Sequence, residues 1–266
     1  MWTTIALLAA LGGTPGQTDL ALTHVRSTHG LLGPERKNES VSPGDVLFLC
    51  FDIEGIKVDD DGKVQYSMAL ELKDERGKVL FKQLPKDLEA KTSLGGVSVP
   101  AYATLNVGLE TPPGDYQFKI TVKDRASGKE QSLSRKFKVL PKDFALVRTQ
   151  TSLDTDGQYP AAVFASGQGA WVHCSAVGFE RGGAGKQPNI VFEMRVLDDT
   201  GKPTLARPVT STIDKGIPAD KVAVPMAFPL SLNRAGKFTI EIAAIDQGSG
   251  KKAKMSFPIT VQSAQN

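Results

Sequence analysis

Residues 114–129 read GDYQFKITVKDRASGK, and residues 236–251 read GKFTIEIAAIDQGSGK. In both stretches apolar side chains alternate with mainly polar neighbours, and the run ends at the pattern Asp-x-x-Ser-Gly-Lys. The alternating residues are Tyr116, Phe118, Ile120 and Val122 in the first stretch, and Phe238, Ile240, Ile242 and Ala244 in the second. A period of two is that of a β-strand with one buried face, and Asp, Ser and Gly are typical of turns. Each stretch therefore predicts a half-buried strand that enters a tight turn.

These stretches belong to a longer repeat, in which residues of about 20–141 return in order at about 142–263. Matched positions keep a nearly constant offset: Arg26 with Arg148 (148 − 26 = 122), Cys50 with Cys174 (174 − 50 = 124), Gly77 with Gly201 (201 − 77 = 124), and Asp124 with Asp246 (246 − 124 = 122). A repeat of this length predicts two copies of one folding module. In this alignment the two cysteines are equivalent.

The repeat divides the chain of 266 residues into three predicted parts. They are a signal-peptide-like segment at 1–18, a first domain at 19–141 and a second domain at 142–266. Each domain is near the common domain size and can bury its own core. The domains meet at Leu140–Asp143, and this short linker contains Pro, which predicts restricted domain motion.

Strand periodicity extends through both copies. Tyr66, Met68, Leu70 and Leu72 alternate with polar or small residues, and Ile190, Phe192, Met194 and Val196 follow the same phase. The predicted strands are 20–27, 46–54, 64–73, 78–83, 101–109, 115–124 and 131–139, and then 143–150, 169–178, 189–197, 203–210, 223–232, 236–246 and 253–261. The sequence contains no convincing amphipathic helix of three turns. Strands without crossover helices pair antiparallel, so we predict an all-β chain of two tandem antiparallel β-sandwiches with about seven strands each.

At Gly114–Phe118 the first copy resembles the entry to the sixth strand of the immunoglobulin-like and fibronectin-type sandwich superfamily, where Gly-x-Tyr-x-Cys is common. The resemblance implies an immunoglobulin-like fold in which the Tyr116 hydroxyl bonds nearby backbone. It also implies that Cys50 lies on the second strand, facing Phe118, and that Cys174 faces Ile240. The arrangement is similar to exported bacterial proteins built from tandem modules of this kind. Because this fold hosts many functions, the resemblance implies no activity.

The first residues contain the short apolar run Ile5–Leu11, followed by small and turn-forming residues. This order is typical of a secretory signal peptide, although no Lys or Arg precedes the run. The alternative interpretation is an apolar tail. We expect an exported protein that is periplasmic, at the cell surface or secreted. No later stretch is long and apolar enough to predict a transmembrane helix.

The charge pattern bears on the class of partner. The net charge is +3, and Lys, Asp and Glu are interspersed without a basic stripe. Nucleic-acid binding usually requires such a stripe, so we expect no nucleic-acid partner.

The sequence offers few residues for chemistry. Cys50 and Cys174 lie in separate predicted domains, and we expect two buried, reduced thiols that do not join each other. The three histidines, His24, His29 and His173, are not in a metal-ligand spacing. No nucleophile elbow or phosphate-binding loop is recognised.

Two acidic runs, Asp59–Gly62 and Asp154–Gly157, leave two interpretations open. Clustered carboxylates in flexible loops suit calcium, whereas Asp-Gly pairs also form hairpin turns for reasons of backbone geometry. The turn interpretation is the stronger one, because neither run has a distal bidentate Glu. Asp124 and Asp246 are likewise expected to accept hydrogen bonds from backbone two residues on.

We therefore predict no catalytic, cofactor-binding or metal-binding residue, and no cofactor. The leading hypothesis is a non-enzymatic exported interaction or structural module whose partner is a protein or an envelope polysaccharide. The alternative is an accessory of an envelope hydrolase, or an enzyme with an active site that the sequence does not reveal. A binder predicts a localised apolar patch, a spacer an evenly polar surface, and an enzyme a pocket of converging polar groups. The run Val46–Phe51, apolar on both faces, predicts a central strand under a neighbouring domain or a surface that receives a partner strand.

Overall fold

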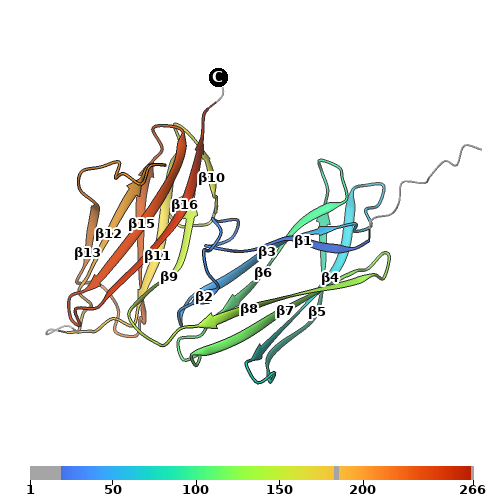
Figure 1. Cartoon of the computed structure of the whole chain (residues 1–266), viewed down its shortest axis with the longest axis horizontal. Coiled ribbons are helices and arrows are strands. Elements are labelled where there is room, and N and C mark those ends of the chain that lie inside the picture. The colour runs from blue at the N-terminus through green and yellow to red at the C-terminus, as the bar shows by residue number, and fades with distance from the viewer. Residues whose placement is uncertain (1–18, 183–185, 265–266) are drawn as a thin grey trace, which may run out of the picture.

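The computed structural model describes residues 19–182 and 186–264, and over these ranges the chain forms sixteen β-strands in four sheets and no helix (Figure 1). The prediction of an all-β chain is therefore confirmed. The signal-peptide-like segment at 1–18 lies outside the described residues. Within the described ranges, nothing has the form of a helix that could cross a membrane.

The first copy forms two sheets from eight strands. One has the order β1-β3-β6, and the other the order β2-β8-β7-β4-β5. The strands are β1 Ala21–Thr28, β2 Ser40–Val41, β3 Val46–Glu54, β4 Lys63–Asp74, β5 Val79–Lys91, β6 Ser98–Asn106, β7 Gly114–Asp124 and β8 Glu130–Val139. All pairings are antiparallel except that of β2 with β8.

The second copy repeats this plan with the sheet orders β14-β11-β9 and β10-β16-β15-β12-β13. Its strands are β9 Ala145–Ser152, β10 Val163–Ala165, β11 Gly169–Val177, β12 Ile190–Leu197, β13 Val209–Ile213, β14 Ala223–Ser231, β15 Gly236–Asp246 and β16 Lys252–Gln262. Each copy thus has eight strands where about seven were predicted. The unexpected ones, β2 and β10, are two and three residues long, too short to show a period in the sequence.

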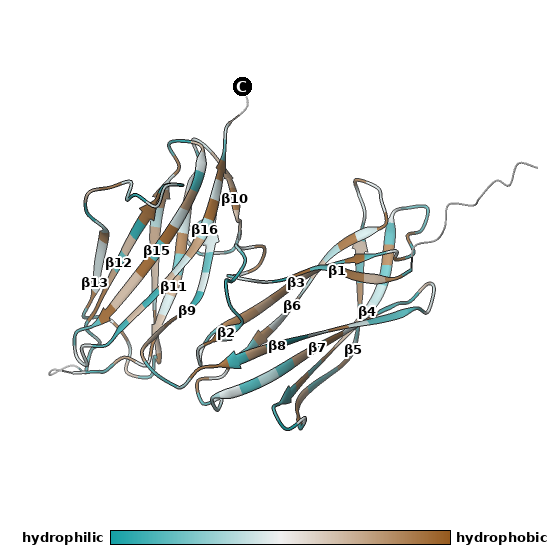
Figure 2. Ribbon diagram, viewed as in Figure 1, coloured by the Kyte–Doolittle hydropathy of each residue, from teal (hydrophilic) through white to brown (hydrophobic). Residues whose placement is uncertain are grey.

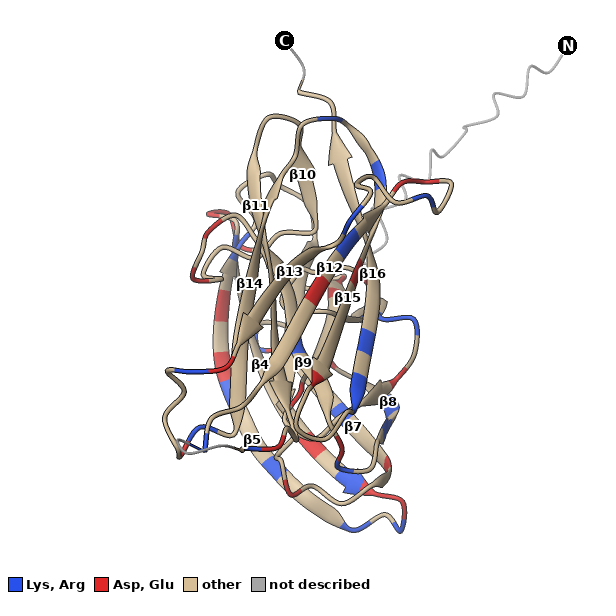
Figure 3. Cartoon of the chain, turned by 90° about the vertical axis from the view of Figure 1, so that its left-hand side faces the viewer, with Lys and Arg blue, Asp and Glu red and all other residues tan. Residues whose placement is uncertain are grey.

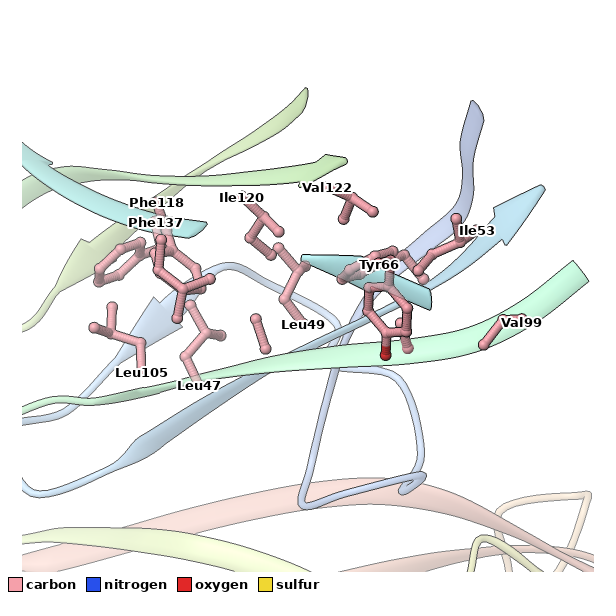
Figure 4. Packing of buried hydrophobic residues seen from close by; sticks show 14 of the residues in the cluster. Leu47, Leu49, Ile53, Tyr66, Val99, Leu105, Phe118, Ile120, Val122 and Phe137 are labelled. Carbon is pink, nitrogen blue, oxygen red and sulfur yellow. The ribbon is translucent and has the colours of Figure 1, made fainter. Parts of the chain in front are cut away.

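The core of each copy lies between its two sheets, which gives a sandwich-like arrangement. In the first copy Phe118, Ile120 and Val122 of β7 point toward Leu47 and Leu49 of β3 (Figure 4). Phe118 and Leu47 are fully buried, and burying such a side chain contributes about 1.5–3 kcal/mol. Strand β3 is apolar along most of its length (Figure 2). It pairs with β1 on one side and β6 on the other, so it is a central strand and cannot receive a partner strand.

The structure corrects the alignment of the two cysteines. The core-facing residues of β3 are Leu47, Leu49, Phe51 and Ile53, and those of β11 are Ala170, Val172, Cys174 and Ala176. Cys174 therefore matches Phe51 (174 − 51 = 123), and Cys50 matches His173. Neighbouring residues of a strand face opposite sides of the sheet. Cys50 thus faces away from its core, and the expectation that it faces Phe118 is wrong.

The start of each copy also differs from the predicted alignment. His24 and Arg148 both have positive φ, at 49° and 53°, and each lies at an irregularity in the pairing of its strand. They are equivalent at an offset of 148 − 24 = 124, whereas the sequence matched Arg148 with Arg26. A positive φ is uncommon outside glycine, so this shared bulge identifies the register better than the short sequence match does.

The loop after β1 contacts the second copy (Figure 1). The ring of His29 lies 5.5 Å from the ring of Phe257 on β16. Gly30 passes so close to β9 that an added Cβ would lie 2.5 Å from the Cβ of Gln150. Gly30 also has a φ of +75°, which glycine adopts without strain. The chain therefore needs glycine here for both space and backbone conformation.

A polar cluster completes this contact, which we call the joint: the largely buried His29, Gly30, Arg36 and Asp45 of the first copy with the exposed Arg148 of the second. The Asp45 carboxylate accepts hydrogen bonds from Arg36 Nη2 at 2.9 Å and from the Arg148 backbone N–H at 2.7 Å. The side chains of Arg36 and Asp45 are 7% and 6% exposed. Arg148 Nε also donates to the Gly44 carbonyl at 3.0 Å. The two bonds of Arg148 cross between the copies and oppose their relative movement.

Candidate functional site

A cleft of about 630 Å³ opens in the second copy, between β12 and β13 of one sheet and β14 of the other. We call it the β12–β14 cleft. Its apolar lining comes from five strands and from the segments before β13 and after β14: Met194, Val196, Pro203, Leu205, Val209, Pro229, Leu230, Leu232, Phe238, Ile259 and Val261. Several of these residues also belong to the core. The cleft is therefore a place where the apolar interior of the sandwich reaches the surface.

The end of the cleft is shaped by the corner between β14 and β15. In the first copy the Tyr116 hydroxyl donates to the Pro112 carbonyl at 2.8 Å, as the resemblance implied. The second copy has Phe238 at this position and cannot form that bond. Instead the Arg234 guanidinium lies over the Phe238 ring, 4.8 Å from its centroid. A cation over an aromatic face is attracted by the ring quadrupole, so Arg234 is held at the edge of the cleft.

The charged groups of the rim are Asp198, Lys202 and Arg234. The Asp198 carboxylate accepts hydrogen bonds from the hydroxyl and backbone N–H of Thr200 and from the Lys202 backbone N–H. The Thr200 hydroxyl contributes most to lowering the pKa of Asp198. Within the part of the chain that the structure describes, neither Lys202 nor Arg234 forms an ion pair. The rim therefore offers two cations to a ligand.

The lining of the cleft combines apolar side chains with two cations. Apolar side chains favour a ligand that buries apolar surface, and the two cations favour an adjacent anionic group. His173, Cys50 and Cys174 are not among the lining residues. The cleft brings together residues from 194 to 261, and no motif in the sequence pointed to it.

A second hollow, on the first copy, is more polar. It has a volume of about 710 Å³ and is lined largely by charged side chains, including Asp74, Glu75, Asp115, Lys136 and Lys138. Both signs of charge are interspersed over the face in Figure 3.

The two thiols are unbonded and buried, each 2% exposed. Cys174 lies in the second core, where burial raises the pKa of its thiol to about 12. Cys50 lies on the outer face of its sheet, with its Sγ 3.5 Å from the Thr28 hydroxyl oxygen. Because thiolate is the reactive form, the Cys174 environment favours an inert side chain.

The three histidines lie in different places. His24 is exposed and pairs with Asp52, and His29 belongs to the joint. His173 Nε2 lies 2.7 Å from Ser152 Oγ, and burial lowers the pKa of its ring.

The contact between His173 and Ser152 is structural. The Ser152 hydroxyl donates to the Asp154 carbonyl at 2.6 Å, so its oxygen accepts from the protonated His173 Nε2. A histidine that donates to the hydroxyl cannot remove its proton, and Ser152 is fully buried. The pair therefore lacks the geometry of an activated nucleophile.

The acidic turns use their carboxylates internally. Asp154 accepts hydrogen bonds from the backbone N–H groups of Asp156, Gln158 and Tyr159. Asp59 does the same with two backbone N–H groups of its own turn. Over the described ranges, no group of three or more His, Cys, Asp or Glu side chains is placed to hold a metal ion. These bonds are those of turns.

The repeated turns after β7 and β15 are also closed by carboxylates. The expected bonds to backbone two residues on are present: Asp124 accepts from the Ala126 N–H at 2.9 Å, and Asp246 from the Gly248 N–H at 3.2 Å. Each carboxylate also accepts from a Ser hydroxyl three residues on.

No protein-family model and no curated protein sequence matches the chain. Among solved structures, it is similar to Escherichia coli alpha-2-macroglobulin activated by porcine elastase (11% identity, TM-score 0.32), covering 95% of this chain and 23% of the other. It is also similar to dimeric latent PorU from Porphyromonas gingivalis (10% identity, TM-score 0.38), covering 94% of this chain and 21% of the other. A third similar structure is the Pseudomonas fluorescens DNA glycosylase AlkC bound to abasic-site DNA (14% identity, TM-score 0.28), covering 46% of this chain and 30% of the other. The chain spans less than a third of the length of each, and similarity at this level identifies no function.

Proposed function

We propose that this chain is a non-enzymatic interaction module that acts after export, in the periplasm, at the cell surface or as a secreted protein, and that it binds a protein partner. The observation that carries the proposal is the β12–β14 cleft, an apolar hollow with Lys202 and Arg234 at its rim. A cleft of this kind suits an apolar side chain with an acidic neighbour.

A protein partner fits the cleft better than an envelope polysaccharide does. Polysaccharides present hydroxyl groups, which lose hydrogen bonds with water when they enter an apolar site. The lining has eleven apolar residues, among them Met194, Leu230 and Ile259, against six with polar or charged side chains. Apolar side chains of a protein lose no such bonds.

We also propose that each copy is an immunoglobulin-like domain, with bounds at 19–141 and 142–266. The Tyr116 corner bond and the absence of a sheet shared by both copies over the described ranges support this proposal. Each half, expressed alone, is expected to give a β-sheet circular dichroism spectrum and a cooperative unfolding transition. A half that stays unfolded on its own would contradict these bounds.

The test of the proposed function is a pull-down from an envelope fraction, read by mass spectrometry. The variant Lys202→Glu/Arg234→Glu reverses the charge of the rim, while Lys237→Glu changes an exposed charge outside the lining residues. We expect one protein to co-purify with the wild type and with Lys237→Glu and to be lost from the double variant. Equal recovery with all three, or recovery of polysaccharide alone, would refute the cleft as a protein site. Reproducible hydrolysis of envelope substrates by the purified chain would favour the enzyme alternative.

A further inference from the structure

A second surface lies on the first copy, where its two sheets differ in width. The sheet β1-β3-β6 has three strands and faces a sheet of five that ends at β5. Strand β6 pairs with β3 only, so over the described ranges its other edge has no neighbour. Beside that edge is a groove of about 350 Å³, whose lining includes Met68, Leu70, Leu88 and Tyr102.

Exposed apolar side chains are concentrated in the stretch of chain from β5 to β6, which borders this groove. Of the fifteen large apolar side chains that are exposed in the described ranges, seven lie between residues 79 and 102. They are Val79, Leu80, Phe81, Leu84, Leu94, Val97 and Tyr102. Phe81 is opposite Leu72 of β4, on the side of the sheet that faces the core, yet it is 47% exposed. A side chain there lacks cover because the opposite sheet stops at β6.

The free edge of β6 presents a ladder of backbone groups. In an antiparallel pair, successive residues direct their N–H and C=O groups alternately toward the partner and away from it. Pro100 has no N–H to give to β3, so its position must face the free edge. Residues two apart share this direction, and therefore the N–H groups of Tyr102, Thr104 and Asn106 also point outward. These three amides can pair with an added strand.

The second copy differs at this point. Strand β14 has Pro225 and Pro229 four residues apart. Because backbone direction alternates along a strand, the backbone groups of these two residues point to the same side of β14. Both therefore face its free edge, and only Ala227 lies between them in the outward row. Proline on an edge blocks the addition of a strand. The outward amides of β14 are thus interrupted where those of β6 are continuous.

Charge further limits the occupant. The nine residues of β6 include no charged side chain, so the edge lacks the lysines that commonly protect edge strands. Lys86 of β5 lines the groove and forms no ion pair in the described part of the chain. The two acidic residues nearby on β5 are already paired, Asp87 with Arg125 and Glu89 with Lys63.

We propose that the first copy accepts one extended strand of a partner protein along the free edge of β6, with alternating apolar residues over the groove and a carboxylate at Lys86. A second copy of this chain fits poorly, because its own five-stranded sheet would occupy the space that β5 already covers. A single strand would instead lie opposite β5 and shield Met68 and Phe81 from water. This surface is separate from the β12–β14 cleft, so it goes beyond the function proposed above.

The test uses the full chain and a nine-residue synthetic peptide, in which Thr and Val alternate and one Val is replaced by Glu. The control peptide has the same composition with its Val residues contiguous. Binding is followed by NMR titration and by amide exchange. We expect saturable binding of the alternating peptide and at least tenfold slower exchange at Tyr102, Thr104 and Asn106. The amide of Ala227, in the second copy, should not change.

One matched pair of variants and one charge reversal separate strand pairing from loss of structure. Thr104→Pro removes one outward N–H and should weaken binding at least tenfold, whereas Thr104→Val keeps the N–H and should bind as the wild type does. Lys86→Glu should weaken binding of the Glu peptide and strengthen binding of a peptide with Lys in its place.

Three results would overturn the proposal. They are no saturable binding at about 1 mM peptide, equal binding by Thr104→Pro and Thr104→Val, or protection of the β6 amides by self-association without peptide. Because these readouts do not involve Lys202 or Arg234, failure here is distinguishable from failure at the cleft.

Discussion

Replacing Asp45 with Ala removes the polar centre of the joint. The carboxylate pairs with Arg36 at 2.9 Å and accepts the backbone N–H groups of Arg148 at 2.7 Å and Val46 at 2.9 Å. Because the Arg36 side chain is only 7% exposed, the variant leaves a buried guanidinium without its partner. Breaking a buried ion pair in this way costs about 3–5 kcal/mol, a large part of the stability of a typical protein.

The assay is urea unfolding, with the free energy taken from the transition of each variant. Asp52→Ala is the matched control, because Asp52 pairs with an exposed His24 and such pairs contribute less than about 1 kcal/mol. The variant Asp45→Leu/Arg36→Met replaces both partners with apolar groups and should recover much of the loss. We also expect Asp45→Ala to loosen the two copies, which small-angle X-ray scattering would detect as a wider distance distribution. A loss below about 1 kcal/mol for Asp45→Ala would refute the role given to the joint.

Three further predictions concern single side chains. Burial lowers the pKa of His29 to about 4 from 6.5, so the unfolded chain takes up a proton between pH 6.5 and pH 4 that the folded chain does not. The free energy of unfolding should therefore fall by up to about 3 kcal/mol as the pH is lowered from 6.5 to 4. If the His29→Gln variant lost stability as steeply over this range as the wild type, this assignment would be contradicted. Alkylation should label neither Cys50 nor Cys174 in the native protein and should label both after denaturation. Labelling of either thiol in the native protein, or of neither thiol in the denatured protein without reductant, would contradict this prediction. Tyr116→Phe should lower the free energy of unfolding by about 1 kcal/mol through loss of its bond to Pro112, and unaltered urea unfolding would count against that bond.

The strands with a clear period could be predicted from the sequence, because alternation of apolar residues reflects one buried face. The β7 and β15 runs from Tyr116 and Phe238 are examples. Strand β5 was expected at 78–83 but extends to Lys91. Its second half contains Pro85 and several charges, which resemble a loop, and it continues as a strand through an irregularity in the pairing near Met68.

The register of β3 against β11 was harder to predict. A sequence match of two cysteines suggested equivalence, but a displacement of one residue turns a side chain to the opposite face. The match of Cys50 with His173 becomes visible only from which residues of β3 and β11 face the core. The β12–β14 cleft could not be predicted either. It depends on how far apart two sheet edges lie, and residues as distant as Met194 and Val261 meet there only after folding.

The joint has a consequence for affinity. A short linker and the buried bonds of Asp45 hold the two copies together, so the β6 edge and the β12–β14 cleft keep a fixed separation. For one partner that reaches both surfaces, the second contact forms at an effective concentration set by this geometry, which can raise overall affinity by about 10²–10⁴ without any new contact. The chain would then select partners by the spacing of their two binding features. A flexible hinge in place of the joint would remove this selectivity while leaving each surface intact.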